Sequence, residues 1–161
     1  MTTPVVTVES FASFYAREYR AVLTLAHALT GDPGLAEDLT QETFLAAFLA
    51  WKGLANPEGW VRSAVSNKAM SWWRRTYAAR RAMSRVATPE QTVREMPADS
   101  LAFWTEVRRL PRRQAEAVVL YYLEDRSVEE ISLLLGCAPS TTRMHLTRGR
   151  RALASRLRRE L

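Results

Sequence analysis

The chain has 161 residues, of which 47% are hydrophobic and 25% charged, a composition typical of one globular domain or two small ones. Its longest unbroken apolar run, Leu45–Trp51, is far shorter than the roughly 20 residues of a membrane-spanning helix, and its N-terminus lacks the order of a secretory signal. One cysteine and two histidines exclude an internal disulfide and a Cys/His zinc site. We therefore expect a cytoplasmic protein without membrane insertion, metal or cofactor.

The net charge of +6 is divided unevenly along the sequence. Residues 1–61 carry −4, residues 62–85 carry +7, residues 86–139 carry −3 and residues 140–161 carry +6. Compact basic blocks in an otherwise acidic chain are typical of surfaces that bind a polyanion, and acidic stretches beside them are typical of protein-binding faces. The alternative is an arginine-rich surface that only faces solvent.

Apolar residues in the first half recur at every third or fourth position, which predicts an all-α protein. Asp32-Pro33 is typical of a helix cap followed by proline in the first turn, and Gly31 is typical of the end of the preceding helix. The pattern predicts helices over residues 10–30, 32–51 and 58–80, with a loop over residues 52–57.

A second helical set begins after a stretch without periodicity. Residues 86–100 contain two prolines and few large apolar residues, so we expect a flexible linker between two small domains, residues 1–85 and 101–161. New helices are expected near Leu101 and from Pro111. Ser127, followed three residues later by Glu130, matches a capping box at the start of another helix.

The last two predicted helices have helix-turn-helix spacing, with a break at residues 136–139 before a basic C-terminal helix. Leu146, Leu153 and Leu157 share one side of that helix and should pack inward. The opposite side and its flank carry side chains suited to base edges, thymine methyls or phosphates, namely Thr141, Arg143, Met144, Thr147, Arg148 and Arg151. The helix therefore predicts DNA binding; the alternative is an amphipathic helix with a solvated basic face.

The helix over residues 58–80 combines basic and aromatic side chains. Trp60, Asn67 and Arg74 lie seven residues apart along one side, with Trp73 and Tyr77 near other arginines. Aromatic rings exposed among arginines suit single-stranded DNA, whose bases can stack on them. The alternative is that the tryptophans belong to the core.

Three stretches resemble bacterial RNA polymerase sigma factors. Residues 36–45 (AEDLTQETFL) resemble region 2.2, residues 57–75 resemble regions 2.3 and 2.4, and residues 110–150 resemble region 4. Regions 1.1 and 3 have no counterpart, which is similar to the extracytoplasmic-function (ECF) sigma factors. The run Ser-Trp-Trp-Arg-Arg at residues 71–75 is similar to their actinobacterial SigE-like subgroup.

The resemblance implies an alternative-type sigma factor, not an enzyme, that directs promoter-specific transcription initiation. Core RNA polymerase, through its β′ clamp helices and its β subunit, would bind a surface with Asp38, Gln41, Glu42 and Phe44. Asn56 would help to form a pocket for a base flipped from the −10 element. The melted strand would be held by Trp60, Arg62, Asn67, Arg74 and Arg75. In the last helix Arg143, Met144, Thr147 and Arg148, beside Thr141 and Arg151, would read the −35 major groove.

Promoter DNA and core polymerase are thus the expected partners, and in many members of this family an anti-sigma factor is a further one; no small-molecule substrate is expected. Family members often carry serine where this chain has Met144 and a basic residue where it has His145, so no −35 sequence is transferred. The alternative is an autonomous helix-turn-helix regulator, which would bind duplex DNA specifically without polymerase. For an enzyme, the sequence offers no nucleophile–base pair, phosphate loop or metal cluster.

Overall fold

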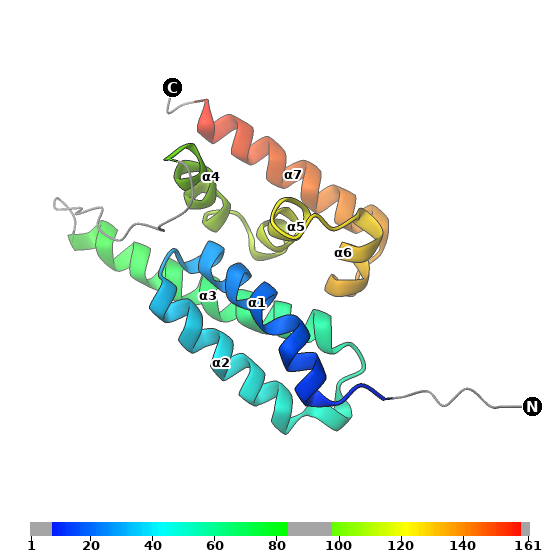
Figure 1. Cartoon of the computed structure of the whole chain (residues 1–161). Helices are drawn as coiled ribbons and strands as arrows, with labels where there is room; N and C mark the ends of the chain where they lie inside the picture. Colours follow the sequence, from blue (N-terminus) through cyan, green and yellow to red (C-terminus); the bar gives the residue numbers. More distant parts are fainter. Residues whose placement is uncertain (1–7, 84–97, 159–161) are drawn as a thin grey trace, which may run out of the picture.

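The computed structural model describes residues 8–83 and 98–158, and within these ranges every regular element is helical, which confirms the all-α prediction (Figure 1). The elements are α1 (Phe11–Thr30), α2 (Pro33–Leu49), the 3-10 turn η1 (Trp51–Gly53), α3 (Pro57–Met83), α4 (Ala98–Arg108), α5 (Arg112–Tyr122), α6 (Val128–Leu135) and α7 (Pro139–Leu157). Most of the linker expected over residues 86–100 lies outside the described residues, and α4 begins within its last three residues.

Local capping explains where the first two helices begin and end. The Oγ of Ser10 accepts a hydrogen bond from the backbone N–H of Ser13 at 3.2 Å, at the start of α1. Gly31 ends α1 with a φ of 71°, a left-handed conformation that glycine adopts without steric cost. One residue later, Asp32 Oδ1 accepts from the N–H of Leu35 at 3.1 Å and starts α2. The predicted stop and restart are both confirmed.

Helices α1, α2 and α3 form the N-terminal bundle (Figure 1). Its core contains an aromatic cluster, in which the ring centroid of Phe44 lies 5.9 Å from that of Phe14 and 5.1 Å from that of Tyr15. Aliphatic side chains continue this core along the three helices, among them Val22, Leu25, Leu29, Val61, Val65 and Met70. Burial of such side chains is the main stabilising term for a bundle of this size.

Helices α4 to α7 form a second bundle, in which α7 lies against both α4 and α5. Its buried apolar residues include Trp104, Val107, Leu110, Val118, Ile131, Leu146 and Leu153. Two glutamates are buried with arginine partners: Glu106 lies beside Arg109 and Arg156, and Glu116 beside Arg112 and Arg113. Burial raises the pKa of Glu116 even though both arginines oppose that shift.

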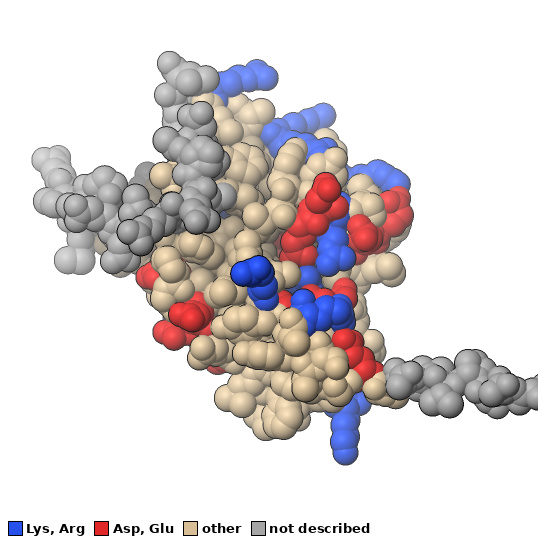
Figure 2. Space-filling model, in the orientation of Figure 1, with Lys and Arg blue, Asp and Glu red and all other residues tan. Residues whose placement is uncertain are grey.

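The two bundles also pack directly against one another, with α4 on α1 and both α5 and α6 on α3 (Figure 1). Nε of Arg108 donates to the carbonyl oxygen of Ala28 in the last turn of α1 at 2.9 Å. Nη2 of Arg74 donates to the carbonyl oxygen of Leu110 at 3.2 Å. Figure 2 shows acidic and basic side chains side by side on the right-hand part of one face of the molecule. This direct contact between the bundles was not part of the sequence prediction.

Candidate nucleic-acid interface

The outward face of α7 carries the residues predicted to read a DNA groove. Thr141 is half-buried and the others are exposed, namely Arg143, Met144, Thr147, Arg148 and Arg151. The opposite face is buried against α5 and α6 through Thr142, Leu146, Gly149 and Leu153. The structure therefore brings the six predicted residues together on one face, as groove reading by a recognition helix requires.

The turn before α7 fixes the orientation of this helix. Ser127 and Glu130 form the predicted capping box, with Glu130 N–H donating to Ser127 Oγ at 3.1 Å and Ser127 N–H donating to Glu130 Oε2 at 2.8 Å. Gly136 ends α6 with a φ of 66°. The hydroxyls of Ser132 and Thr142 lie 2.8 Å apart and join α6 to the buried side of α7. The basic face is thereby held outward by a rigid turn.

Arginines supply the positive charge of the α7 face. Arg143 has one weak ion pair, at 3.5 Å from Glu129, and both side chains are more than half exposed, so phosphate can replace the carboxylate at little cost. Arg150 lies apart from this set: its guanidinium stacks 4.6 Å from the ring centroid of Tyr121 and donates to Tyr122. Burial, with Arg113 and Arg148 nearby, lowers the pKa of His145, which is therefore uncharged at pH 7.

The loop before α3 lines a cavity of about 500 Å³, where the sequence predicted a pocket for a flipped base. Asn56 caps α3 by accepting from the N–H of Gly59 at 3.2 Å. The cavity walls come from both bundles and comprise Gly53, Leu54, Ala55, Asn56, Gly59, Trp60 and Ser63 together with Leu134, Leu135 and Gly136. In this arrangement the end of α6 therefore forms one wall of the predicted base pocket.

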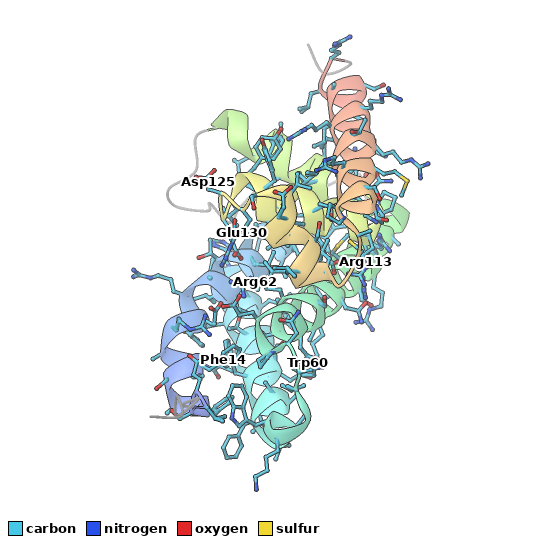
Figure 3. All side chains as sticks on the ribbon, turned by 90° about the vertical axis from the view of Figure 1, so that its right-hand side faces the viewer. Phe14, Trp60, Arg62, Arg113, Asp125 and Glu130 are labelled. Atoms are coloured by element: carbon cyan, nitrogen blue, oxygen red, sulfur yellow. The ribbon has the colours of Figure 1, made fainter. Side chains whose placement is uncertain are left out.

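Arg62 occupies a buried position, contrary to the surface placement expected from the sequence. Its side chain is 2% exposed and lies between Glu18 of α1, at 2.7 Å, and Glu124 of the turn between α5 and α6, at 3.1 Å. Burial alone would lower the pKa of Arg62, but the ion pairs with Glu124 and Glu18 outweigh it and raise the pKa. Figure 3 shows Arg62 at the level where the two bundles meet. Its guanidinium is not accessible to DNA in this arrangement.

The other predicted strand-binding residues of α3 are divided between solvent and the second bundle. Asn67 and Arg75 are exposed. Arg74 is exposed but bonds to the carbonyl of Leu110, and Trp60 is half-buried in the cavity wall. The structure therefore leaves part of this surface open and covers the rest with α5 and α6.

The predicted polymerase-binding surface on α2 is only partly a surface. Asp38, Gln41 and Glu42 are exposed, and Glu42 pairs with Lys68 of α3 at 3.0 Å. Phe44 is 2% exposed and belongs to the aromatic core, so its placement on a docking surface is corrected. A phenylalanine with ring neighbours on α1 holds α2 in place rather than contacting a partner.

Sequence reasoning missed three exposed apolar residues at the end of α2. Leu45, Phe48 and Leu49 are 60%, 57% and 78% exposed. The run Leu45–Trp51 held the signal, because seven consecutive apolar residues exceed what one buried face of a helix can hold. Large exposed apolar side chains beside acidic ones are typical of a protein-binding surface.

Two other kinds of feature were searched for in the described ranges. Residues 8–83 and 98–158 contain no cluster of three His, Cys, Asp or Glu side chains that could hold a metal ion. None of the helices in the described part of the chain is long and apolar enough to cross a bilayer.

Comparison with known proteins matches both bundles. Residues 14–81 match the Sigma-70 region 2 family and residues 100–153 match the Sigma-70, region 4 family. The chain is 31% identical over 163 aligned residues to the RNA polymerase sigma-E factor of Streptomyces avermitilis, covering 96% of this chain and 86% of that protein. It is 33% identical over 145 residues to the ECF RNA polymerase sigma factor SigE of Mycolicibacterium smegmatis, covering 82% of this chain and 55% of that protein.

Solved structures agree in fold. The sigma factor RpoE in complex with the anti-sigma factor NepR from Bartonella quintana has a TM-score of 0.64 at 22% identity, over 94% of this chain and 98% of that one. CnrH in complex with the cytosolic domain of CnrY gives the same score and identity, over 94% and 89%. With two family matches that together span more than half of the sequence, the chain belongs to the sigma-70 family of RNA polymerase sigma factors, in its ECF group.

Proposed function

We propose a division of labour among three surfaces of this sigma factor, which binds core RNA polymerase and directs promoter-specific transcription initiation. It is not an enzyme, because in this family the polymerase performs the chemistry and the sigma factor supplies recognition. The observation that supports the division is spatial: the groove-reading set, the strand-binding set and the exposed acidic-apolar set lie on three different helices, α7, α3 and α2.

The α7 surface reads the −35 element. Its arginines Arg143, Arg148 and Arg151 bind phosphates or guanine edges, and Thr141, Met144 and Thr147 supply the smaller hydroxyl and apolar contacts. Met144 is 38% exposed and can contact a thymine methyl, in contrast to a serine at the same position. We therefore expect a −35 preference that depends on the side chain at residue 144.

The α3 surface holds the melted −10 strand. Asn67, Arg74 and Arg75 bind the backbone, while Trp60 and Asn56 line the cavity that takes a flipped base. The contribution of Arg62 requires that its pairing with Glu124 be broken first, since that pair buries the guanidinium. In this proposal residues 1–85 form region 2, residues 101–161 form region 4, and residues 86–100 join them.

The α2 surface binds the β′ clamp helices of core polymerase, and the β subunit contacts region 4. Asp38, Gln41 and Glu42 supply polar contacts, and Leu45 and Leu49 supply the apolar contact area in place of Phe44. An acidic-apolar docking face suits a DNA-binding protein, because its negative charge keeps promoter DNA away from the polymerase-binding surface.

Two finer assignments belong to this proposal. The chain is placed in the actinobacterial SigE-like subgroup, supported by 31% and 33% identity to the relatives from Streptomyces avermitilis and Mycolicibacterium smegmatis. An anti-sigma factor, as bound by two sigma factors of similar fold, would cover the exposed end of α2 and compete with core polymerase. Simultaneous binding of an anti-sigma factor and core enzyme to this chain would contradict that second assignment.

Run-off transcription with purified core polymerase on genomic fragments tests the main proposal. The wild-type chain should produce discrete transcripts that core enzyme alone does not produce. The double variant Arg143→Ala/Arg148→Ala should lose promoter-specific initiation and keep core binding, because both residues lie on α7. Absence of initiation together with absence of core binding by the wild type would refute the assignment.

A further inference from the structure

The second bundle covers the part of α3 that would receive the −10 strand. Nδ2 of Asn56 donates to the backbone carbonyl of Leu133 in α6 at 2.9 Å, although the same amide lines the predicted base pocket. Arg74 is bonded in the same way to the carbonyl of Leu110. In each case a side chain assigned to DNA is satisfied by a backbone acceptor of region 4.

Gly59 allows the closest approach between the two bundles. A Cβ built on Gly59 would lie 2.3 Å from the carbonyl oxygen of Leu134, closer than any real contact of this kind. Gly59 lies in the first turn of α3, where its N–H already bonds to Asn56. Since alanine is a better helix former than glycine, the helix alone does not explain glycine here. The close packing of α6 on α3 explains it.

Glu124 occupies the position of a phosphate. Its carboxylate accepts from Nε of Arg62 at 3.1 Å and from Nη2 at 3.1 Å, a two-point geometry that guanidinium groups adopt equally with carboxylates and phosphates. The pair is almost fully buried, with Arg62 2% and Glu124 9% exposed. A strand of DNA cannot reach Arg62 without displacing this carboxylate.

The aromatic part of α3 is covered as well. The rings of Trp73 and Tyr77 stack with centroids 4.8 Å apart, and the guanidinium of Arg109 in α4 lies 5.1 Å from the centroid of Tyr77. Nη2 of Arg109 also donates to the hydroxyl of Tyr77 at 2.6 Å. A cation over a ring occupies the face on which a base would stack.

The closed arrangement also conflicts with the size of a promoter. The −10 and −35 elements are roughly 25 base pairs apart, which is about 85 Å along B-DNA at 3.4 Å per base pair. A compact chain of this length has a radius of gyration of about 15 Å, so one closed body cannot reach both elements. The stretch between Met83 and Ala98 is long enough to span about 50 Å when extended, which permits separated bundles to do so.

We infer that the free chain inhibits itself: region 4 covers the −10 surface of region 2, with Glu124 in the place of a DNA phosphate on Arg62 and with the end of α6 seated on Gly59. This inference rests on the proposed function of α3 and adds a regulatory state to it. DNA binding by α3 then requires opening, and core polymerase, which binds the two regions at separate places, favours the open state.

Substitution of Gly59 tests the closed state without removing any charge. Fluorescence energy transfer is measured in a Cys137→Ala background with dyes on Ala12→Cys in α1 and Ser155→Cys in α7, both at exposed positions. Gly59→Ala should lower the transfer efficiency, because its methyl group cannot fit against Leu134. Gly34→Ala is the matched control, since its methyl would meet no atom closer than 3.6 Å. Equal efficiency in Gly59→Ala and its parent would overturn the inference.

Substitution of Glu124 tests the phosphate-like contact. The probe is a fluorescent (dT)12 single strand, titrated against the full chain without polymerase. Glu124→Gln should bind it about tenfold more tightly, the gain expected if the open fraction rises from about a tenth to nearly all. Asp125→Asn is the matched control, because this neighbour loses the same charge and makes no ion pair among the described residues. Equal gains in both variants would indicate simple charge repulsion and overturn the inference.

The two experiments separate this inference from the proposed function. Both use the free protein, whereas the function is tested by transcription with core enzyme. If Gly59→Ala opens the chain but neither protein directs initiation, the closed state stands and the proposed function fails. If transcription succeeds while neither Gly59→Ala nor Glu124→Gln changes transfer efficiency or strand binding, the proposed function stands and self-inhibition is refuted. Circular dichroism identifies a variant that has unfolded, and the other variant then decides.

Discussion

Gly149 of α7 lies so close to Val118 of α5 that a Cβ built on the glycine would sit 2.9 Å from Val118 Cγ2. Val118 is fully buried, and its β-branched side chain has one strongly preferred rotamer in a helix. The absence of a side chain at residue 149 is therefore what lets the groove-reading helix pack directly on the helix behind it.

Gly149→Ala should destabilise region 4 by about 1–3 kcal/mol, because overpacking against a buried, stiff side chain exceeds the gain in helix propensity of about 1 kcal/mol. Urea unfolding followed by circular dichroism measures the change. The double variant Gly149→Ala/Val118→Ala should show a favourable coupling of roughly 1 kcal/mol, since the smaller residue makes room for the new methyl. A variant as stable as the wild type would show that the two helices can separate freely.

Phe44 and Leu45 are neighbours in sequence with opposite roles, and paired substitutions separate them. Phe44→Ala should lower the free energy of unfolding by about 3–5 kcal/mol, because it leaves a cavity in the aromatic core. Leu45→Ser, at a 60% exposed position, should change stability little and weaken core polymerase binding. Thermal unfolding and core-binding titrations measure the two effects. Normal core affinity in Leu45→Ser would argue against α2 as the docking helix.

The capping box at the start of α6 gives region 4 a pH dependence. The hydrogen bond from the backbone N–H of Ser127 lowers the pKa of Glu130 below its usual 4.5. A lowered folded-state pKa contributes stability that is present above about pH 4.5 and is lost as the pH falls through the lower, folded-state value. Glu130→Gln should remove this contribution to the slope of unfolding free energy between pH 6 and pH 3.

Ser127→Ala provides the control for that titration. It removes the hydroxyl cap, which should cost about 1 kcal/mol, and loosens the return bond to Glu130, so the pKa of Glu130 should move back up. Carbon-detected NMR titration of the Glu130 carboxyl measures the shift directly. Identical Glu130 titration in wild type and Ser127→Ala would mean that the box does not form in solution.

Arg148 is exposed on α7 and should contribute to −35 binding mainly through charge-assisted contacts. Arg148→Ala should weaken binding of a duplex −35 fragment by about 1–3 kcal/mol and, if the contact is to phosphate, reduce the salt slope by about one. Arg20→Ala removes the same charge from the exposed side of α1 and serves as control. Equal losses in both variants would mean that net charge, and not the α7 face, sets the affinity.

Local signals predicted most of the fold. Gly31 with Asp32-Pro33 located the turn between α1 and α2, and Ser127 with Glu130 located the start of α6, because capping depends on residues within one helical turn. The outward set on α7 followed from helical periodicity alone. Such features need only the sequence within a few residues of each site.

Long-range contacts explain what the sequence did not predict. Asn56 and Leu133 are 77 residues apart, and Arg62 and Glu124 are 62 apart, so no local pattern could indicate that these residues meet. An arginine in a basic block was read as a surface residue, and only its two distant carboxylates make burial tolerable. The position of Phe44 failed for a related reason: an apolar run with no polar interruption does not reveal which of its members face inward.

The stacked pair of Trp73 and Tyr77 under Arg109 gives the protein a natural optical signal. Indole emission depends on the polarity and ring neighbours of the chromophore, and removal of α4 would take the guanidinium away from this pair. With Trp51, Trp60, Trp72 and Trp104 replaced by phenylalanine, the remaining indole would report in real time, without any attached dye, when and how fast polymerase separates the two bundles. A junction built from aromatic rings is thus also a clock for the first step of transcription initiation.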